Sequence, residues 1–237
     1  MRILVTNGTL LLIVLLGSMH CSAQQDFSDS IKSKNRADKA FFWGATFNNA
    51  LVTFKGDNLP QDYFWRPGLG ITLKTEWFIH RNIGVSAGFT FQAKGAGIIT
   101  PDNFQALGDP DSTHRARIKF YNFELPLVVI LRGGSPIKGT RLRGEFGIIP
   151  SWNVCSKYTF LSIEDGFHFV EDQSDQYYKN DLFLAGAVGL DIDAANACVF
   201  QVHLYGNWGT KNVFDTRFFP NADGRNVVYG IRLGWLF

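Results

Sequence analysis

The segment Gly84-Val85-Ser86-Ala87-Gly88 is the first stretch of this sequence that could carry chemistry, because it matches the G-x-S-x-G motif of serine hydrolases. In those enzymes the serine stands on a sharp turn from a strand into a helix, which exposes its hydroxyl. Here the motif lies inside a run of alternating apolar and small or polar residues, with no helical pattern after it. The context predicts a serine in the middle of a strand, so we assign no catalytic residue and expect no enzyme.

Metal or partner binding is a second kind of chemistry to consider. No two histidines have the i, i+4 spacing of a helical metal site. The segment 163–178 is acidic and aromatic, and carboxylates can bind Ca²⁺ while exposed aromatic rings can anchor a partner. The candidate loop-binding residues are Glu164, Asp165, Phe167, Phe169, Asp172 and Tyr177. A solvated surface loop explains the same composition, so we predict no metal and no cofactor.

The elements that must position these residues are strands, because apolar and small or polar residues alternate in eight segments along the chain. In the last segment, 227–237, one face is bulky and apolar, and the other carries glycines and Arg232. Strands of about 9–11 residues cross a membrane when tilted, and in lipid they must close into a barrel to pair every backbone group. The pattern predicts an all-β fold: an eight-stranded antiparallel up-and-down transmembrane β-barrel.

The expected connections support this topology. Short turns are predicted at 80–82, 133–140 and 194–197, and longer loops at 55–66, 99–116, 162–180 and 215–225. Short periplasmic turns and long outer loops are typical of outer-membrane barrels. A soluble lipocalin-like barrel, with its apolar face inward, has the same strand period. The bulky face would overfill such a small barrel, and the face rich in glycine and alanine would make a poor soluble surface.

The N-terminus predicts export. Arg2, the apolar run 10–16 and the small residues before Gln24 form a secretory signal peptide that is cut after Ala23. A retained membrane anchor and lipidation at Cys21 are the alternatives. We therefore expect a signal peptide at 1–23, a periplasmic segment at 24–40, and an outer-membrane barrel at 41–237. The net charge of +2 gives no basic surface for nucleic acid.

The polar face of the expected barrel gathers charges of both signs in its lumen. Because isolated charges are costly in a confined space, they should pair into a network. An ion pathway is the alternative, but eight strands leave almost no bore. The predicted network comprises Lys74, Glu76, Lys94, Glu124, Arg132, Arg143, Glu145, Asp191, His203 and Arg232.

Three further features concern the ends and the surface of the barrel. Trp235 and the final residue Phe237 lie on one face and are expected to form the assembly signal that the barrel-assembly machinery reads. Near the outer rim, Arg115, Arg117 and Lys119 could meet phosphates of outer-membrane lipid and lipopolysaccharide. The thiols of Cys155 and Cys198 are expected near opposite ends of the barrel, beyond the ~7 Å between Cα atoms that a disulfide spans.

Several segments together resemble the PorT-like outer-membrane β-barrel family. They include the Pro67-Gly68-Leu69-Gly70 run, the segment 88–95, the Phe123-Glu124-Leu125-Pro126-Leu127 strand and the aromatic C-terminus. Ile149-Pro150 departs from the family pattern. The resemblance implies an eight-stranded barrel that is structural or accessory and supports protein secretion of the type IX kind, with secretion-system proteins as partners. An adhesin or ligand receptor that acts through the outer loops is the second hypothesis, and a lipid-modifying barrel enzyme is the third.

Overall fold

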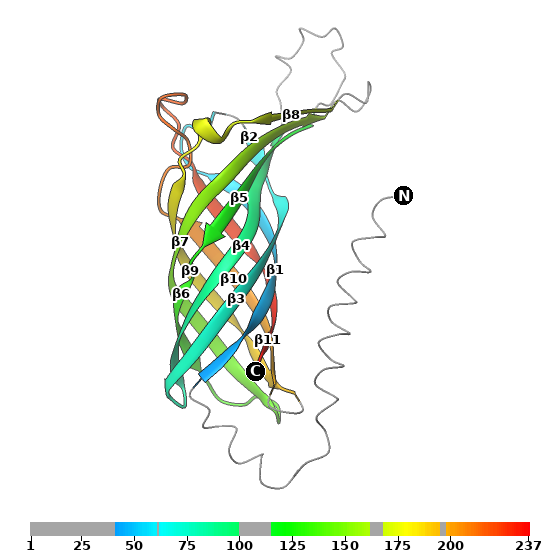
Figure 1. The fold of residues 1–237 in the computed structure, drawn as a ribbon, viewed down its shortest axis with the longest axis vertical. Helices are drawn as coiled ribbons and strands as arrows, with labels where there is room; N and C mark the ends of the chain where they lie inside the picture. Colours follow the sequence, from blue (N-terminus) through cyan, green and yellow to red (C-terminus); the bar gives the residue numbers. More distant parts are fainter. Residues whose placement is uncertain (1–40, 61, 100–114, 162–167, 195–197) are drawn as a thin grey trace.

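The computed structural model describes residues 41–60, 62–99, 115–161, 168–194 and 198–237 (Figure 1). The expected signal peptide, its cleavage after Ala23 and the segment 24–40 lie outside these residues. The elements are β1 (Phe41–Lys55), β2 (Asp62–Phe64), β3 (Arg66–His80), β4 (Ile83–Ile99), β5 (Arg115–Glu124), β6 (Leu127–Arg132), β7 (Thr140–Leu161), β8 (His168–Asp172), the 3-10 turn η3 (Ser174–Gln176), β9 (Asn180–Asp193), β10 (Val199–Gly209) and β11 (Arg225–Leu236).

The strands close into a ring. The order is β4-β3-β1-β11-β10-β9-β7-β5, and β4 also pairs with β5, so the sheet returns to its starting strand. All of these pairings are antiparallel. Both the start of β1 and the C-terminus lie at the lower end of the barrel in Figure 1. This arrangement confirms the eight-stranded antiparallel barrel that the sequence predicts.

One strand position of the barrel ring is occupied by two shorter strands that follow each other. β5 and β6 both lie between β4 and β7, and they are separated only by Leu125 and Pro126. Proline has no N–H to donate to a neighbouring strand, which ends the regular ladder here. The two residues between β5 and β6 still bond to both neighbouring strands. Gly88 N–H of β4 donates to Pro126 O at 3.1 Å, and Leu125 N–H donates to Pro150 O of β7 at 2.9 Å.

Two of the expected outer loops contain strands. The segment 55–66 includes β2, which pairs with the outer end of β4, and the segment 162–180 includes β8, which pairs with the outer end of β7. The sheet therefore continues above the ring, because β7 and β4 are long strands of 22 and 17 residues. Figure 1 shows β7 and β8 rising and bending away from the barrel axis at its upper end.

Side chains alternate between the two faces of the barrel strands, apart from register shifts between Phe78 and His80 and between Tyr121 and Asn122. On β3, Leu73 and Trp77 are both 62% exposed, whereas their neighbours Lys74 and Glu76 are 7% and 0% exposed. The apolar side chains thus point outward and the charged ones point inward, the reverse of a soluble barrel. Among the described residues, no helix is long and apolar enough to span a membrane.

Aromatic side chains gather at both ends of the outward face. At the end that holds the C-terminus, the rings of Trp43 and Phe237 lie 5.4 Å apart. At the other end, Tyr229 lies between Trp65 and Trp208, with ring separations of 5.6 and 5.2 Å. Such aromatic belts mark the two membrane–water interfaces of barrels that span a bilayer.

Candidate functional site

The lumen of the barrel collects all ten charged or titratable residues that the sequence places there. Lys74 and Glu76 come from β3, Lys94 from β4, Glu124 from β5, Arg132 from β6, Arg143 and Glu145 from β7, Asp191 from β9, His203 from β10 and Arg232 from β11. Nine of them are buried, and the Arg232 side chain is 14% exposed. Because each lies on the inward-facing register of its strand, ring closure brings them together.

Arg143 is the centre of this lumen network. Its guanidinium donates to both carboxylate oxygens of Glu76, at 2.7 and 2.8 Å. It also lies 2.6 Å from Glu145 and 3.2 Å from Asp191. One cation therefore contacts three buried carboxylates, and paired, hydrogen-bonded geometry of this kind offsets the cost of burying the charges.

The other cations complete the coordination of the same three carboxylates. Lys74 lies 2.8 Å from Glu76, and Arg132 Nε donates to Asp191 at 2.9 Å. Arg232 donates to Glu145 at 2.7 Å. The imidazole of His203 lies between two of the carboxylates, 3.5 Å from Asp191 and 3.8 Å from Glu145.

Gln201 also belongs to the lumen network, although charge alone did not single it out. Its amide donates to Asp191 Oδ1 at 2.9 Å, and the residue is fully buried. The signal that could have found it is its position on β10, two residues before His203 and on the same face of the strand.

Lys94 and Glu124 form a separate pair nearer the outer end. They make an ion pair with each other, and the ammonium of Lys94 also lies 3.5 Å from the centre of the Phe183 ring. Glu124 further accepts a hydrogen bond from Ser151. The predicted network is therefore divided into a large cluster around Arg143 and this smaller pair.

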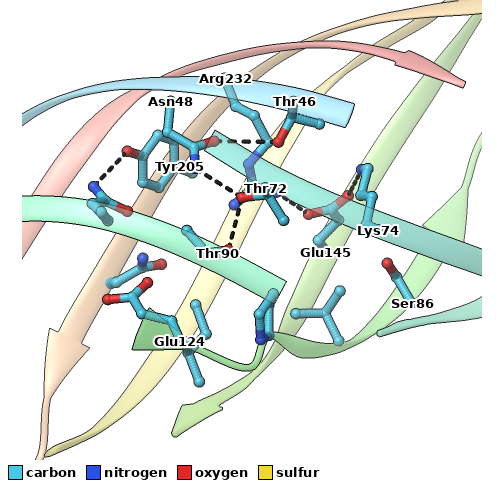
Figure 2. Close-up of a pocket in the computed structure, with 15 residues that line it drawn as sticks. Thr46, Asn48, Thr72, Lys74, Ser86, Thr90, Glu124, Glu145, Tyr205 and Arg232 are labelled. Atoms are coloured by element: carbon cyan, nitrogen blue, oxygen red, sulfur yellow. Dashed lines mark hydrogen bonds and ion pairs between the residues drawn. The ribbon is translucent and has the colours of Figure 1, made fainter. Parts of the chain in front are cut away.

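Hydroxyl and amide groups occupy the lumen between the two clusters (Figure 2). Asn48 donates to Thr72 at 2.9 Å, and the hydroxyls of Thr72 and Thr90 are 2.8 Å apart. Beside them lies a cavity of about 30 Å³, which is lined by both clusters and by Tyr205. This volume suits a single bound water and is far too small for a solute pathway.

Apolar clusters close both ends of the lumen formed by the described residues. At the end that holds the C-terminus, Phe42 and Phe78 pack edge to face, 5.8 Å apart, against Ile130, Val199 and Leu236. We call the cluster at the other end the outer cap. Its buried members are Phe54, Ala96, Ile98, Ala116, Ile118, Phe120, Phe160, Tyr177, Val213, Phe214 and Ala222.

The outer cap corrects one expectation about the loops. Tyr177 was a candidate surface contact, but only 4% of it is exposed, and its ring packs 4.9 Å from that of Phe120. The loop folds inward because the cap offers its ring an apolar environment, and burial raises the pKa of Tyr177. Phe169 stays exposed on β8, and Asp172 accepts hydrogen bonds from Ser174. Glu164, Asp165 and Phe167 lie outside the described residues.

The motifs with catalytic or metal-binding chemistry do not assemble a site. Ser86 lies near the start of β4 on the lumen face, opposite Glu76 in the register, and not on a strand-to-helix turn. Among the described residues, no histidine bonds to its hydroxyl and no cluster of His, Cys, Asp and Glu is arranged for a metal ion. Cys155 and Cys198 do not form a disulfide, as expected.

The residues of the expected assembly signal lie where the barrel closes. Phe237 exchanges two backbone hydrogen bonds with Trp43 of β1, at 2.8 and 3.3 Å. Trp235 stacks on Phe200 of β10, with ring centres 4.7 Å apart. The last strand therefore joins the first strand through main-chain bonds and through aromatic contacts at the end of the barrel that holds the C-terminus.

Comparisons with curated proteins and with solved structures gave different results. A search of curated proteins gives no match. Among solved structures, the chain is similar to Ail of Yersinia pestis (16% identity, TM-score 0.37, covering 83% of this chain and 98% of that one). It is also similar to OprG from Pseudomonas aeruginosa (14%, 0.43, covering 83% and 95%) and to Neisserial surface protein A (8%, 0.40, covering 82% and 96%).

The family assignment rests on a sequence model and on the barrel itself. The model described as the outer membrane protein beta-barrel domain matches residues 23–215. This range includes most of the barrel strands and nine of the ten charged lumen residues. The chain belongs to the outer membrane protein beta-barrel domain family and is an outer-membrane β-barrel protein.

Proposed function

We propose that this chain is a non-enzymatic structural or accessory barrel of the PorT-like type, which supports protein secretion of the type IX kind. The observation that carries the proposal is the filled lumen. The contact between Arg143 and Glu76 crosses the interior, and apolar clusters close both ends of the described barrel. A barrel with this interior has little room for a solute, so it acts through its outward surfaces and its two rims.

The rims offer surfaces for partners. At the end that holds the C-terminus, the turn between β6 and β7 carries Ile137, which is 67% exposed. On the outer side, the sheet of β4, β5, β7 and β8 extends beyond the ring. An accessory barrel would hold other secretion components at these rims while its rigid wall fixes their position in the membrane.

The experiment is extraction of the native outer membrane in mild detergent, followed by sizing and identification of the co-purifying proteins. We expect the barrel to elute in a large complex with secretion components. The variant Ile137→Ser should reduce this co-elution, whereas Ile79→Ser, another exposed position on the same side, serves as the matched control. Elution as a stand-alone monomer, together with unimpaired secretion in a deletion strain, would rule out the accessory role.

A surface-binding barrel is the second candidate, and β8 is the observation that favours it. Among the described strands β8 pairs with β7 alone, which leaves its other edge for an additional strand, and Phe169 and Val170 are 44% and 48% exposed. An adhesin or receptor should lose ligand or host-cell binding in a Phe169→Ser and Val170→Ser double variant while secretion remains normal. Intact binding together with impaired secretion in this variant would exclude the surface-binding function.

A further inference from the structure

A cluster of cations lies on the outside of the barrel near its outer rim. On β5, Ile118 and Phe120 point inward and are 2% exposed, so the alternating residues Arg117 and Lys119 face outward. Lys157 of β7 is exposed and lies directly opposite Lys119 in the register. We call these three residues the rim cations. The positive charge of Arg66 also acts on Lys119.

Two of the rim cations, Arg117 and Lys119, form no ion pair within the described part of the chain. Like charges that lie directly opposite on neighbouring strands repel each other, and Lys119 and Lys157 are such a pair. Every cation of the lumen network has a carboxylate partner within 4 Å, yet within the described residues neither the rim cations nor Arg66 form an ion pair. Asp172 lies opposite Lys157 on β8 and its charge acts on Lys157, but the two groups are beyond ion-pair distance and the carboxylate accepts hydrogen bonds from Ser174.

Arg66 adds a second, independent observation. Its Nη1 is buried and has no hydrogen-bond partner among the described residues. A buried donor without a partner is costly, so a ligand that reaches this atom would complete its hydrogen bonding. The guanidinium is a preferred donor to phosphate because its planar fork matches two oxygens at once.

An apolar surface continues directly below the rim cations. Tyr121 is the next outward residue of β5, and its ring stacks on that of Phe91 at 6.3 Å. Phe91 in turn contacts Phe123 at 5.4 Å, and these two side chains are 45% and 38% exposed to lipid. From Lys119 to Phe123 the chain advances about 13 Å at roughly 3.3 Å per residue, so charge and aromatic surface are adjacent.

We propose that Arg117, Lys119 and Lys157, with Arg66, bind the phosphate groups of an anionic lipid in the outer leaflet. The acyl chains of this lipid lie along Phe91, Tyr121 and Phe123. Charge complementarity selects the phosphate, and the aromatic surface immediately below selects a lipid over a free anion. This inference is independent of the proposed secretion role, because it concerns the lipid-facing wall and no protein partner.

The test uses the purified full-length barrel in a neutral detergent, with phosphorylated lipid A and enzymatically dephosphorylated lipid A as probes. Native mass spectrometry counts the bound lipid. We expect the triple variant Arg117→Gln, Lys119→Gln, Lys157→Gln to bind phosphorylated lipid A about tenfold more weakly, since three partly screened contacts are lost. Binding to the native barrel should also weaken as salt is raised. The dephosphorylated probe should not distinguish the variant from the native barrel.

The matched control is Lys55→Gln with Arg225→Gln. These two cations also lie directly opposite each other at the outer ends of β1 and β11, but Asp57 and Asp223 are two residues away from them. The control should retain phosphorylated lipid A within about twofold of the native barrel. Heat-modifiability on gels verifies that each variant is folded, and the single variant Lys119→Gln replaces the triple variant if the latter does not fold.

Equal retention of phosphorylated and dephosphorylated lipid A would overturn the proposal. Equal loss of lipid A binding in the triple variant and in the control would overturn it too. A further test is competition with inorganic phosphate, compared with chloride at the same ionic strength. If phosphate displaces lipid A fully, the site takes a free anion and the assignment to a lipid is wrong. Persistence of lipid binding against phosphate, together with its loss in the triple variant, supports it.

Discussion

The guanidinium of Arg143 donates hydrogen bonds to both carboxylate oxygens of Glu76, although β7 and β3 are not neighbours in the barrel. β4 and the interrupted strand β5–β6 separate them along the wall, so the contact crosses the lumen. Both side chains are fully buried. A bidentate pair in this position ties two walls of the barrel together and helps to fill its interior.

Removal of this cross-lumen contact should destabilise the barrel strongly. In an Arg143→Met variant, Glu76, Glu145 and Asp191 lose their shared cation and remain buried. We expect the free energy of unfolding to fall by about 3–5 kcal/mol, the usual cost of removing one partner from buried ion pairs. Urea unfolding in lipid vesicles, followed by tryptophan fluorescence, measures it.

The control for this prediction is the exposed pair of Arg141 and Asp193, whose side chains are 25% and 30% exposed. An Arg141→Gln variant should lose less than about 1 kcal/mol, because water screens the pair. Equal losses in the two variants would show that the lumen network does not stabilise the fold.

The filled lumen predicts that the barrel does not conduct. In planar bilayers the folded protein should produce no regular conductance steps, because the lumen network and the two apolar clusters leave small cavities of about 30 and 10 Å³ in the described barrel. The matched experiment is a Phe42→Ala and Phe214→Ala variant, which opens the two ends and keeps the charged middle. Reproducible unitary steps from the native protein would contradict the closed interior.

Phe214 should control the order of the outer cap. The ring is fully buried and packs edge to face against Phe54 at 5.6 Å and Phe219 at 5.5 Å. We expect Phe214→Ala to cost about 3–5 kcal/mol of unfolding free energy, or to release the loop before β11 if the loss stays local. Limited proteolysis and urea unfolding distinguish these two responses.

Phe218→Ala is the control for the outer cap. This phenylalanine lies four residues further along the same loop and is 51% exposed. Its removal should leave both the protease pattern and the unfolding midpoint close to those of the native barrel. A similar effect at both positions would mean that the cap does not depend on burial of the Phe214 ring.

The C-terminal residue is expected to matter for assembly. Deletion of Phe237 removes two backbone hydrogen bonds to Trp43 and the ring contact between them. We propose that the barrel-assembly machinery reads this end, so the deletion should lower the folded, heat-modifiable fraction in the outer membrane several-fold. Phe237→Trp keeps both the main-chain bonds and an aromatic ring and should assemble normally. Normal assembly of the deletion variant would show that Phe237 is not part of an assembly signal.

Period-two alternation by itself determined which side chains face the lumen and which face lipid. Leu73, Lys74, Glu76 and Trp77 could be assigned correctly from the sequence because successive residues of any strand point to opposite faces. Strand count and the antiparallel ring followed as well, since backbone groups in lipid must all be paired and closure is the solution for strands. The short turns at 80–82 and 133–140 matched the observed connections.

Tertiary structure alone decided the partners of these residues. Arg143 meets Glu76 only because closure of the ring and the stagger of its strands bring β7 opposite β3, and no local pattern encodes that distance. The inward position of Tyr177 is also non-local, since the cap that buries its ring comes from distant strands. Alternation states on which face a side chain lies, whereas the three-dimensional closure of the sheet determines what it contacts there.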